Sequence, residues 1–107
     1  MTIQFNTDNN LTLHENFRAT LHDLVTEELS RFSENITRVE VHLSDVNGHK
    51  DGQNDKRCLL EARVEGRPPI AVTDEANTYE QAVNGAIDKL KSSLEKMQGR
   101  MKDHEQG

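Results

Sequence analysis

The middle of the chain alternates strictly between apolar and polar residues. Residues 37–44 and residues 56–66 each place an apolar side chain at every second position. The apolar set in this register is Val39, Val41, Leu43, Cys58, Leu60, Ala62 and Val64. Because successive side chains of a strand point to opposite faces, the pattern predicts two strands buried on one face only. Short β-branched or aromatic runs at residues 2–6 and 70–74 predict two more strands.

Residues 13–32 carry apolar side chains at the spacing of a helix. The stripe consists of Leu13, Phe17, Leu21, Leu24, Val25, Leu29 and Phe32. Thr12, followed three residues later by Glu15, resembles a capping box, so we expect the helix to start there. Acidic residues occupy much of the remaining surface, which predicts an amphipathic helix with a negative outer face.

Residues 79–97 form a second, longer helical stripe. Its apolar members are Tyr79, Ala82, Val83, Ala86, Leu90, Leu94 and Met97. Asn77 and Glu80 repeat the pattern of a cap, which predicts a helix start near Asn77. Gly99 is a typical helix stop, and residues 100–107 are predicted to form a flexible tail.

The predicted order of elements is therefore β-α-β-β-β-α, in the α+β class. Two helices on one face of a four-stranded sheet would bury every apolar stripe and leave the other sheet face exposed. The length of 107 residues suits one domain, which we place at residues 1–99.

Composition predicts a globular cytoplasmic protein. The chain is 33% hydrophobic and 30% charged, an ordinary balance for a folded domain. No run of about 18 apolar residues is present, so we expect no membrane span. The N-terminus lacks the basic and apolar segments of a secretory signal. Cys58 is the sole cysteine, which excludes an internal disulfide and suits a reducing compartment.

Calcium binding and phosphate binding are two candidate functions for the polar segment at residues 45–55, between the two alternating runs. A calcium loop aligned on Gly52 would place His49 and Cys58 where oxygen ligands belong, and calcium disfavours both. The spacing of Gly48 and Gly52 does not satisfy a phosphate-binding loop. The segment is best interpreted as the long tip of a β-hairpin.

Catalytic and metal chemistry find no support in the sequence. The five histidines form no helical pair of the zinc-protease type, and Cys58 has no second cysteine to share a metal. Ser92 and Ser93 lack an adjacent base or a glycine-rich turn. We therefore predict that the protein is not an enzyme and uses no cofactor, metal or small-molecule substrate.

Charge is distributed unevenly along an acidic chain. The net charge is −6, yet residues 89–102 contain five basic residues against Glu95 alone. Lys89, Lys96 and Arg100 fall on one helical stripe, and Lys91 lies on another. Such a run can steer a polyanion. It is also typical of a solvated face or of cations that compensate the dipole at a helix C-terminus, and composition alone leaves these alternatives open.

The chain resembles the ribosome hibernation-promoting factors and ribosome-associated translation inhibitors, also called sigma-54 modulation proteins. The resemblance rests on the element order, on "LSRFSENITRVEVHLSD" and on "TDEANTYEQAVNGAIDKLKSSLEK". The segment "DKRCLLEARVEGRPPIAVT" looks like a subgroup of short proteobacterial members. No second domain follows in this chain, so pairing of ribosomes through one is not expected.

The resemblance implies a non-catalytic protein that binds ribosomal RNA of the small ribosomal subunit in the decoding channel. It would block messenger and transfer RNA during stress. The implied RNA-binding residues of the closing helix are Lys89, Lys91, Lys96 and Arg100, and those of the sheet are Arg38, Lys56, Arg57 and Arg63. Such binding should weaken with salt. The alternative is a small acidic protein-interaction module that keeps the fold without binding ribosomes.

Overall fold

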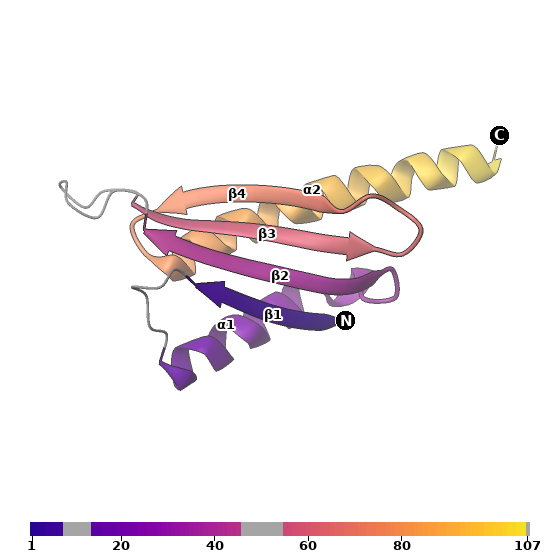
Figure 1. The fold of residues 1–107 in the computed structure, drawn as a ribbon. Helices are drawn as coiled ribbons and strands as arrows, with labels where there is room; N and C mark the ends of the chain where they lie inside the picture. The colour runs from indigo at the N-terminus through magenta and orange to yellow at the C-terminus, as the bar shows by residue number, and fades with distance from the viewer. Residues whose placement is uncertain (8–13, 46–54, 107) are drawn as a thin grey trace.

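The computed structural model describes residues 1–7, 14–45 and 55–106, with side chains described as far as residue 98 (Figure 1). The elements in chain order are β1 (Thr2–Thr7), α1 (Glu15–Glu28), the 3-10 turn η1 (Ser30–Phe32), β2 (Ile36–Asp45), β3 (Lys56–Val64), β4 (Ile70–Ala76) and α2 (Tyr79–Gln106). The predicted order β-α-β-β-β-α and the α+β class are confirmed.

The four strands form one mixed sheet in the order β1-β2-β3-β4. β1 runs parallel to β2, because α1 carries the chain back across the sheet between them. β2, β3 and β4 form an antiparallel meander. The antiparallel pairing of β2 with β3 confirms the hairpin; of its predicted tip at residues 45–55, residues 46–54 lie outside the described residues.

The core lies between one face of the sheet and the two helices, which both lie behind it in Figure 1. All seven apolar residues of the alternating runs are buried, as predicted, and they pack against buried side chains of α1, η1 and α2. The opposite sheet surface, here called the open face, carries Thr2, Gln4, Asn6, Arg38, Glu40, His42, Ser44, Arg57, Leu59, Glu61, Arg63, Ala71, Thr73 and Glu75.

The helix starts differ from the sequence-based expectations. α1 begins at Glu15, with His14 in the N-cap position and no side-chain cap, while Thr12 lies outside the described residues. α2 begins at Tyr79, and the Gln81 amide donates to Oγ1 of Thr78 at 3.1 Å. Thr78 therefore caps α2 one residue later than the predicted start at Asn77, because its hydroxyl reaches an amide of the first turn.

The predicted end of α2 is also wrong. The helix does not stop at Gly99 but continues to Gln106 (Figure 1). Glycine in a helix costs about 1 kcal/mol relative to alanine, and strong helix formers on both sides of Gly99 can offset this cost. The division into a domain of residues 1–99 and a mobile tail stays a prediction. Within the described residues, no helix is long and apolar enough to cross a membrane.

Candidate nucleic-acid interface

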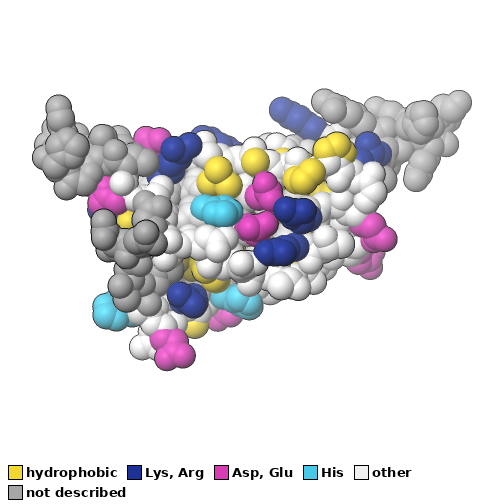
Figure 2. Space-filling model, in the orientation of Figure 1, with side chains coloured by type: hydrophobic (Ala, Val, Ile, Leu, Met, Phe, Trp, Pro, Cys, Tyr) yellow, Lys and Arg dark blue, Asp and Glu magenta, His cyan; other side chains and the backbone are white. Residues whose placement is uncertain are grey.

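The open face interleaves charges of both signs. Its three arginines, from β2 and β3, stand among three glutamates, from β2, β3 and β4. Figure 2 shows basic and acidic side chains side by side near the middle of this face, with a histidine next to them. The open face is therefore a charge-balanced polar surface rather than a uniformly basic one.

Glu40 lies at the centre of this charge pattern. Its Oε2 is 3.8 Å from Nε of Arg38 and 3.7 Å from Nε of Arg63, so one carboxylate faces two guanidinium groups. Its Oε1 is 3.7 Å from Nε2 of His42 and accepts a hydrogen bond from Nδ2 of Asn6 at 3.5 Å. The Glu40 side chain is only 14% exposed. Two of the predicted RNA-binding arginines are thus partly neutralised by a nearly buried acid.

Both arginines have further partners. Arg38 also donates to the side-chain oxygen of Gln4 on β1, and Arg63 Nη2 lies 3.4 Å from Oε1 of Glu61. These contacts place both guanidinium groups next to acceptor oxygens of neighbouring strand residues. A phosphate that approaches them must compete with acids that are already in place.

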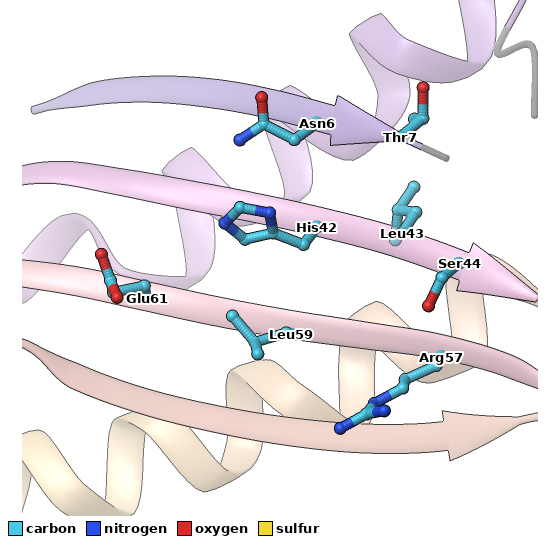
Figure 3. A pocket seen from close by; sticks show the side chains of 8 residues that line it. All are labelled: Asn6, Thr7, His42, Leu43, Ser44, Arg57, Leu59 and Glu61. Atoms are coloured by element: carbon cyan, nitrogen blue, oxygen red, sulfur yellow. The ribbon is translucent and has the colours of Figure 1, made fainter. Parts of the chain in front are cut away.

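Arg57 differs from the other two arginines of the open face. It lines a shallow hollow of about 480 Å³, together with Asn6, Thr7, His42, Leu43, Ser44, Leu59 and Glu61 (Figure 3). In the part of the chain that the structure describes, Arg57 forms no ion pair, although Glu75 is its register partner on β4. Its charge is therefore more available to an incoming anion.

Lys56 lies on the other side of the sheet, at the end covered by α2. Its Nζ is 3.0 Å from Oδ2 of Asp45 and 3.5 Å from Oδ2 of the buried Asp55, and it lies 5.6 Å from the centroid of the Tyr79 ring. The hydrogen bond to Asp45 raises the pKa of Lys56 above its ordinary value. The structure therefore separates this predicted RNA-binding residue from the three arginines of the open face.

The cations of α2 point to two sides of the helix. Nζ of Lys89 donates to the backbone oxygen of Thr73 at 2.7 Å and lies 3.1 Å from Oδ1 of Asp74, so it covers the free edge of β4. Nζ of Lys91 instead lies 3.1 Å from Oε1 of Glu28 on α1. Glu95, one turn further on, pairs with Arg31 of η1. The Lys91 stripe thus joins α2 to the α1 side.

Lys96 follows Lys89 on the β4 side of α2. It lines a hollow of about 370 Å³ with Ser93, Met97 and residues 67–70 of the turn between β3 and β4. Neither Lys96 nor Arg67 has an ion-pair partner within the described residues. Arg100 lies on α2, and its side chain is not among those described.

Arg67 is a basic residue that the sequence analysis did not select. Gly66, with a φ of +74°, lets the chain turn between β3 and β4 so that Arg67 stands exposed beside α2. Its position between a glycine and two prolines was the available signal, since a rigid exposed turn holds a side chain in a fixed place.

The arrangement favours binding chemistry over covalent chemistry. The Cys58 thiol is fully buried, and burial raises its pKa to about 12, so it is held in the unreactive neutral form. Within residues 1–7, 14–45 and 55–98, no three histidine, cysteine or acidic side chains come together as a metal site would require. The surface offers paired cations, two cations around one hollow, and an unpaired arginine on the open face.

Known proteins resemble this chain in both sequence and fold. A family profile described as "Sigma 54 modulation protein / S30EA ribosomal protein" matches residues 4–102. None of the curated protein sequences matches the chain significantly.

Two solved structures share the fold. A ribosomal subunit interface protein from Coxiella burnetii aligns with a TM-score of 0.70 at 17% identity, over 92% of this chain and 99% of that one. The N-terminal domain of Protein Y from Thermus thermophilus aligns with a TM-score of 0.66 at 21% identity, over 91% and 99%. The family profile covers nearly the whole chain, so the resemblance seen in the sequence is confirmed: this protein belongs to the sigma-54 modulation protein / S30EA ribosomal protein family.

Proposed function

We propose that this protein binds the ribosome and inhibits translation without catalysing a reaction. The observation that carries the proposal is the family match over residues 4–102, on a chain whose described elements complete the shared fold. The likeness to a ribosomal subunit interface protein supports the same role. Its site of action, in this proposal, is the decoding channel of the small subunit, where its bulk excludes messenger and transfer RNA.

The contacts to ribosomal RNA are proposed to be made mainly with phosphates. The aromatic side chains of the described residues, Phe5, Phe17, Phe32 and Tyr79, are buried or partly buried in the core, so they offer no platform for stacked bases. Folded RNA can be recognised through its shape and backbone without such platforms. Arg57, Lys89 and Lys96 are the cations best placed to serve this purpose.

The ion pairs on the surface do not prevent such contacts. Exposed pairs contribute only about 0–1 kcal/mol, so a lysine such as Lys89 can exchange Asp74 for a phosphate at small cost. Each contact with a phosphate releases counterions, which makes the affinity fall steeply with salt. The affinity of this chain for ribosomes should therefore fall as salt is added, with a slope set by the number of phosphates that its cations contact.

The second candidate is a protein-interaction module of the same fold that does not bind ribosomes. The charge balance of the open face favours it, because a surface with both signs suits another protein surface better than a polyanion. Sedimentation of the protein with ribosomes through sucrose, at low and at high salt, separates the two. Cosedimentation with small subunits that disappears at high salt supports the first candidate, and absence from ribosomal fractions at low salt contradicts it.

A pair of charge variants tests which helix face is used. K89Q/K96Q removes two cations from the β4 side of α2, and R18Q/R31Q removes two from the α1 side as a matched control. We expect the first variant to weaken ribosome association and the second to leave it nearly unchanged. Equal loss in both would show that only net charge matters, and undiminished binding of K89Q/K96Q would contradict the assignment of this helix face.

A further inference from the structure

The hollow between α2 and the turn that joins β3 to β4 has the chemistry of an anion site. Arg67 supplies a guanidinium group from the turn, and Lys96 supplies an ammonium group from the helix. Ser93, one turn before Lys96 on α2, adds a hydroxyl group to the same hollow. Three groups that can donate hydrogen bonds thus border one space, and two of them carry a positive charge.

The charges of this hollow stand out because most cations of the proposed interface are paired. Arg38, Arg63, Lys56, Lys89 and Lys91 each have an acid within 4.0 Å. Within the described residues, Arg67 and Lys96 have none, although Glu65 and Glu95 are close in sequence, and Glu95 pairs with Arg31. Two unpaired cations around one hollow, on a chain of net charge −6, leave a local positive potential.

The rest of the hollow is apolar. Pro68, Pro69, Ile70 and Met97 line it beside the charged groups. Such a lining suits a ligand with an anionic group and a less polar body, and a volume of about 370 Å³ lies in the range of small-ligand sites. A phosphate matches the guanidinium group well, since two of its oxygens can accept from the parallel N–H groups of one arginine.

We propose that this hollow binds a nucleotide, with the phosphate held by Arg67, Ser93 and Lys96 and the sugar and base lying against the prolines and Met97. The inference rests on the proposed function, for which it supplies a defined position of one RNA nucleotide. It adds Arg67, which lies outside both the sheet and the closing helix, to the residues that contact RNA. It also places this contact away from the open face.

A titration of the isolated chain, followed by backbone amide NMR shifts, tests the proposal. Uridine 5′-monophosphate should shift the amides of residues 66–70 and 93–97 more than those of the open face. R67Q/K96Q should weaken this binding about tenfold, as expected for the loss of charge-assisted hydrogen bonds, whereas R18Q/R31Q should change it less than about twofold. Thermal unfolding of both variants checks that they remain folded.

Four outcomes would overturn the proposed nucleotide site. Shifts centred elsewhere on the surface would contradict its position, and unaltered affinity of R67Q/K96Q would contradict its donors. Uridine that binds as tightly as the monophosphate would show that the phosphate is not recognised. Inorganic phosphate that binds as tightly as the monophosphate would overturn the contribution of the apolar lining and hence the assignment to a nucleotide.

Because the titration uses no ribosomes, its outcome is separate from that of the proposed function. If the chain fails to sediment with ribosomes but binds the monophosphate at this hollow, the proposed function fails and the site stands. If it sediments with ribosomes while R67Q/K96Q and the unaltered chain bind the monophosphate equally, the site fails and the proposed function stands.

Discussion

Replacing Glu40 by glutamine removes a negative charge from the middle of the open face while keeping the shape of the side chain. The amide can still accept the hydrogen bond from Asn6. Arg38 and Arg63 lose their shared partner, but both arginine side chains are substantially exposed, at 40% and 53%. Each pair of this kind contributes at most about 1 kcal/mol, and E40Q removes two, so we expect it to lower the free energy of unfolding by no more than about 2 kcal/mol.

The effect on RNA binding should have the opposite sign. A phosphate near Arg38 or Arg63 is repelled by the Glu40 carboxylate, and two unit charges about 4 Å apart interact by about 1 kcal/mol in water and about 4 kcal/mol near a protein surface. Salt reduces this repulsion further. A net gain of about 1 kcal/mol is therefore reasonable, which corresponds to about fivefold tighter binding.

The assay is the dissociation constant for purified small ribosomal subunits at low salt, with urea unfolding as the measure of stability. E27Q is the matched control, because Glu27 is exposed on α1 and the change alters the net charge by the same amount. We expect E40Q to bind more tightly than E27Q, with a difference that shrinks as salt is added. If the two variants bind alike, or if E40Q binds more weakly, Arg38 and Arg63 do not contact RNA phosphates.

Three further predictions concern stability. A Cβ at Gly85 would overlap the carboxylate of Asp74, so G85A should displace Asp74 from Lys89. G85A should therefore not gain the roughly 1 kcal/mol of stability that alanine usually adds to a helix relative to glycine. A higher free energy of unfolding in urea would contradict the close approach of Gly85 and Asp74. Leu60 is fully buried, so L60A should lower the free energy of unfolding by about 2–5 kcal/mol in the same assay, and a loss well below that range would place Leu60 outside the core. Because burial raises the pKa of Cys58 from 9.0 to about 12, the unfolded thiol ionises first, and the stability that this thiol contributes is complete below pH 9 and lost as pH rises towards 12. Between pH 9 and pH 12, the free energy of unfolding of C58A should therefore fall less than that of the unaltered chain. Equal losses in the two proteins, measured by urea unfolding, would show that the Cys58 thiol is not the cause.

Features that depend on a single strand or helix were predictable from the sequence. Alternation in β2 and β3 assigned each side chain to the core or to the open face, because a strand has a fixed period of two. The burial of Cys58 followed from the same register. The cap of α2 was predicted at Asn77, whereas Thr78 caps the helix, since both residue types cap helices and only geometry shows which one reaches the Gln81 amide.

Contacts between distant residues were not predictable. The spacing of Lys89 and Lys91 showed that they occupy different stripes, yet nothing in it indicated that one covers the edge of β4 and the other pairs with Glu28. The partners of a surface lysine depend on how helices pack, which composition does not record. The same holds for Arg67, whose relation to Lys96 exists only once the β3–β4 turn lies against α2.

Chemical footprinting of small-subunit ribosomal RNA, with and without the protein at low salt, tests the central claim most directly. The account predicts protection of nucleotides in the decoding region, which should disappear at high salt and be reduced for K89Q/K96Q. Protection confined to other regions of the subunit, or none at a protein concentration that saturates sedimentation, would contradict the proposed block of messenger and transfer RNA.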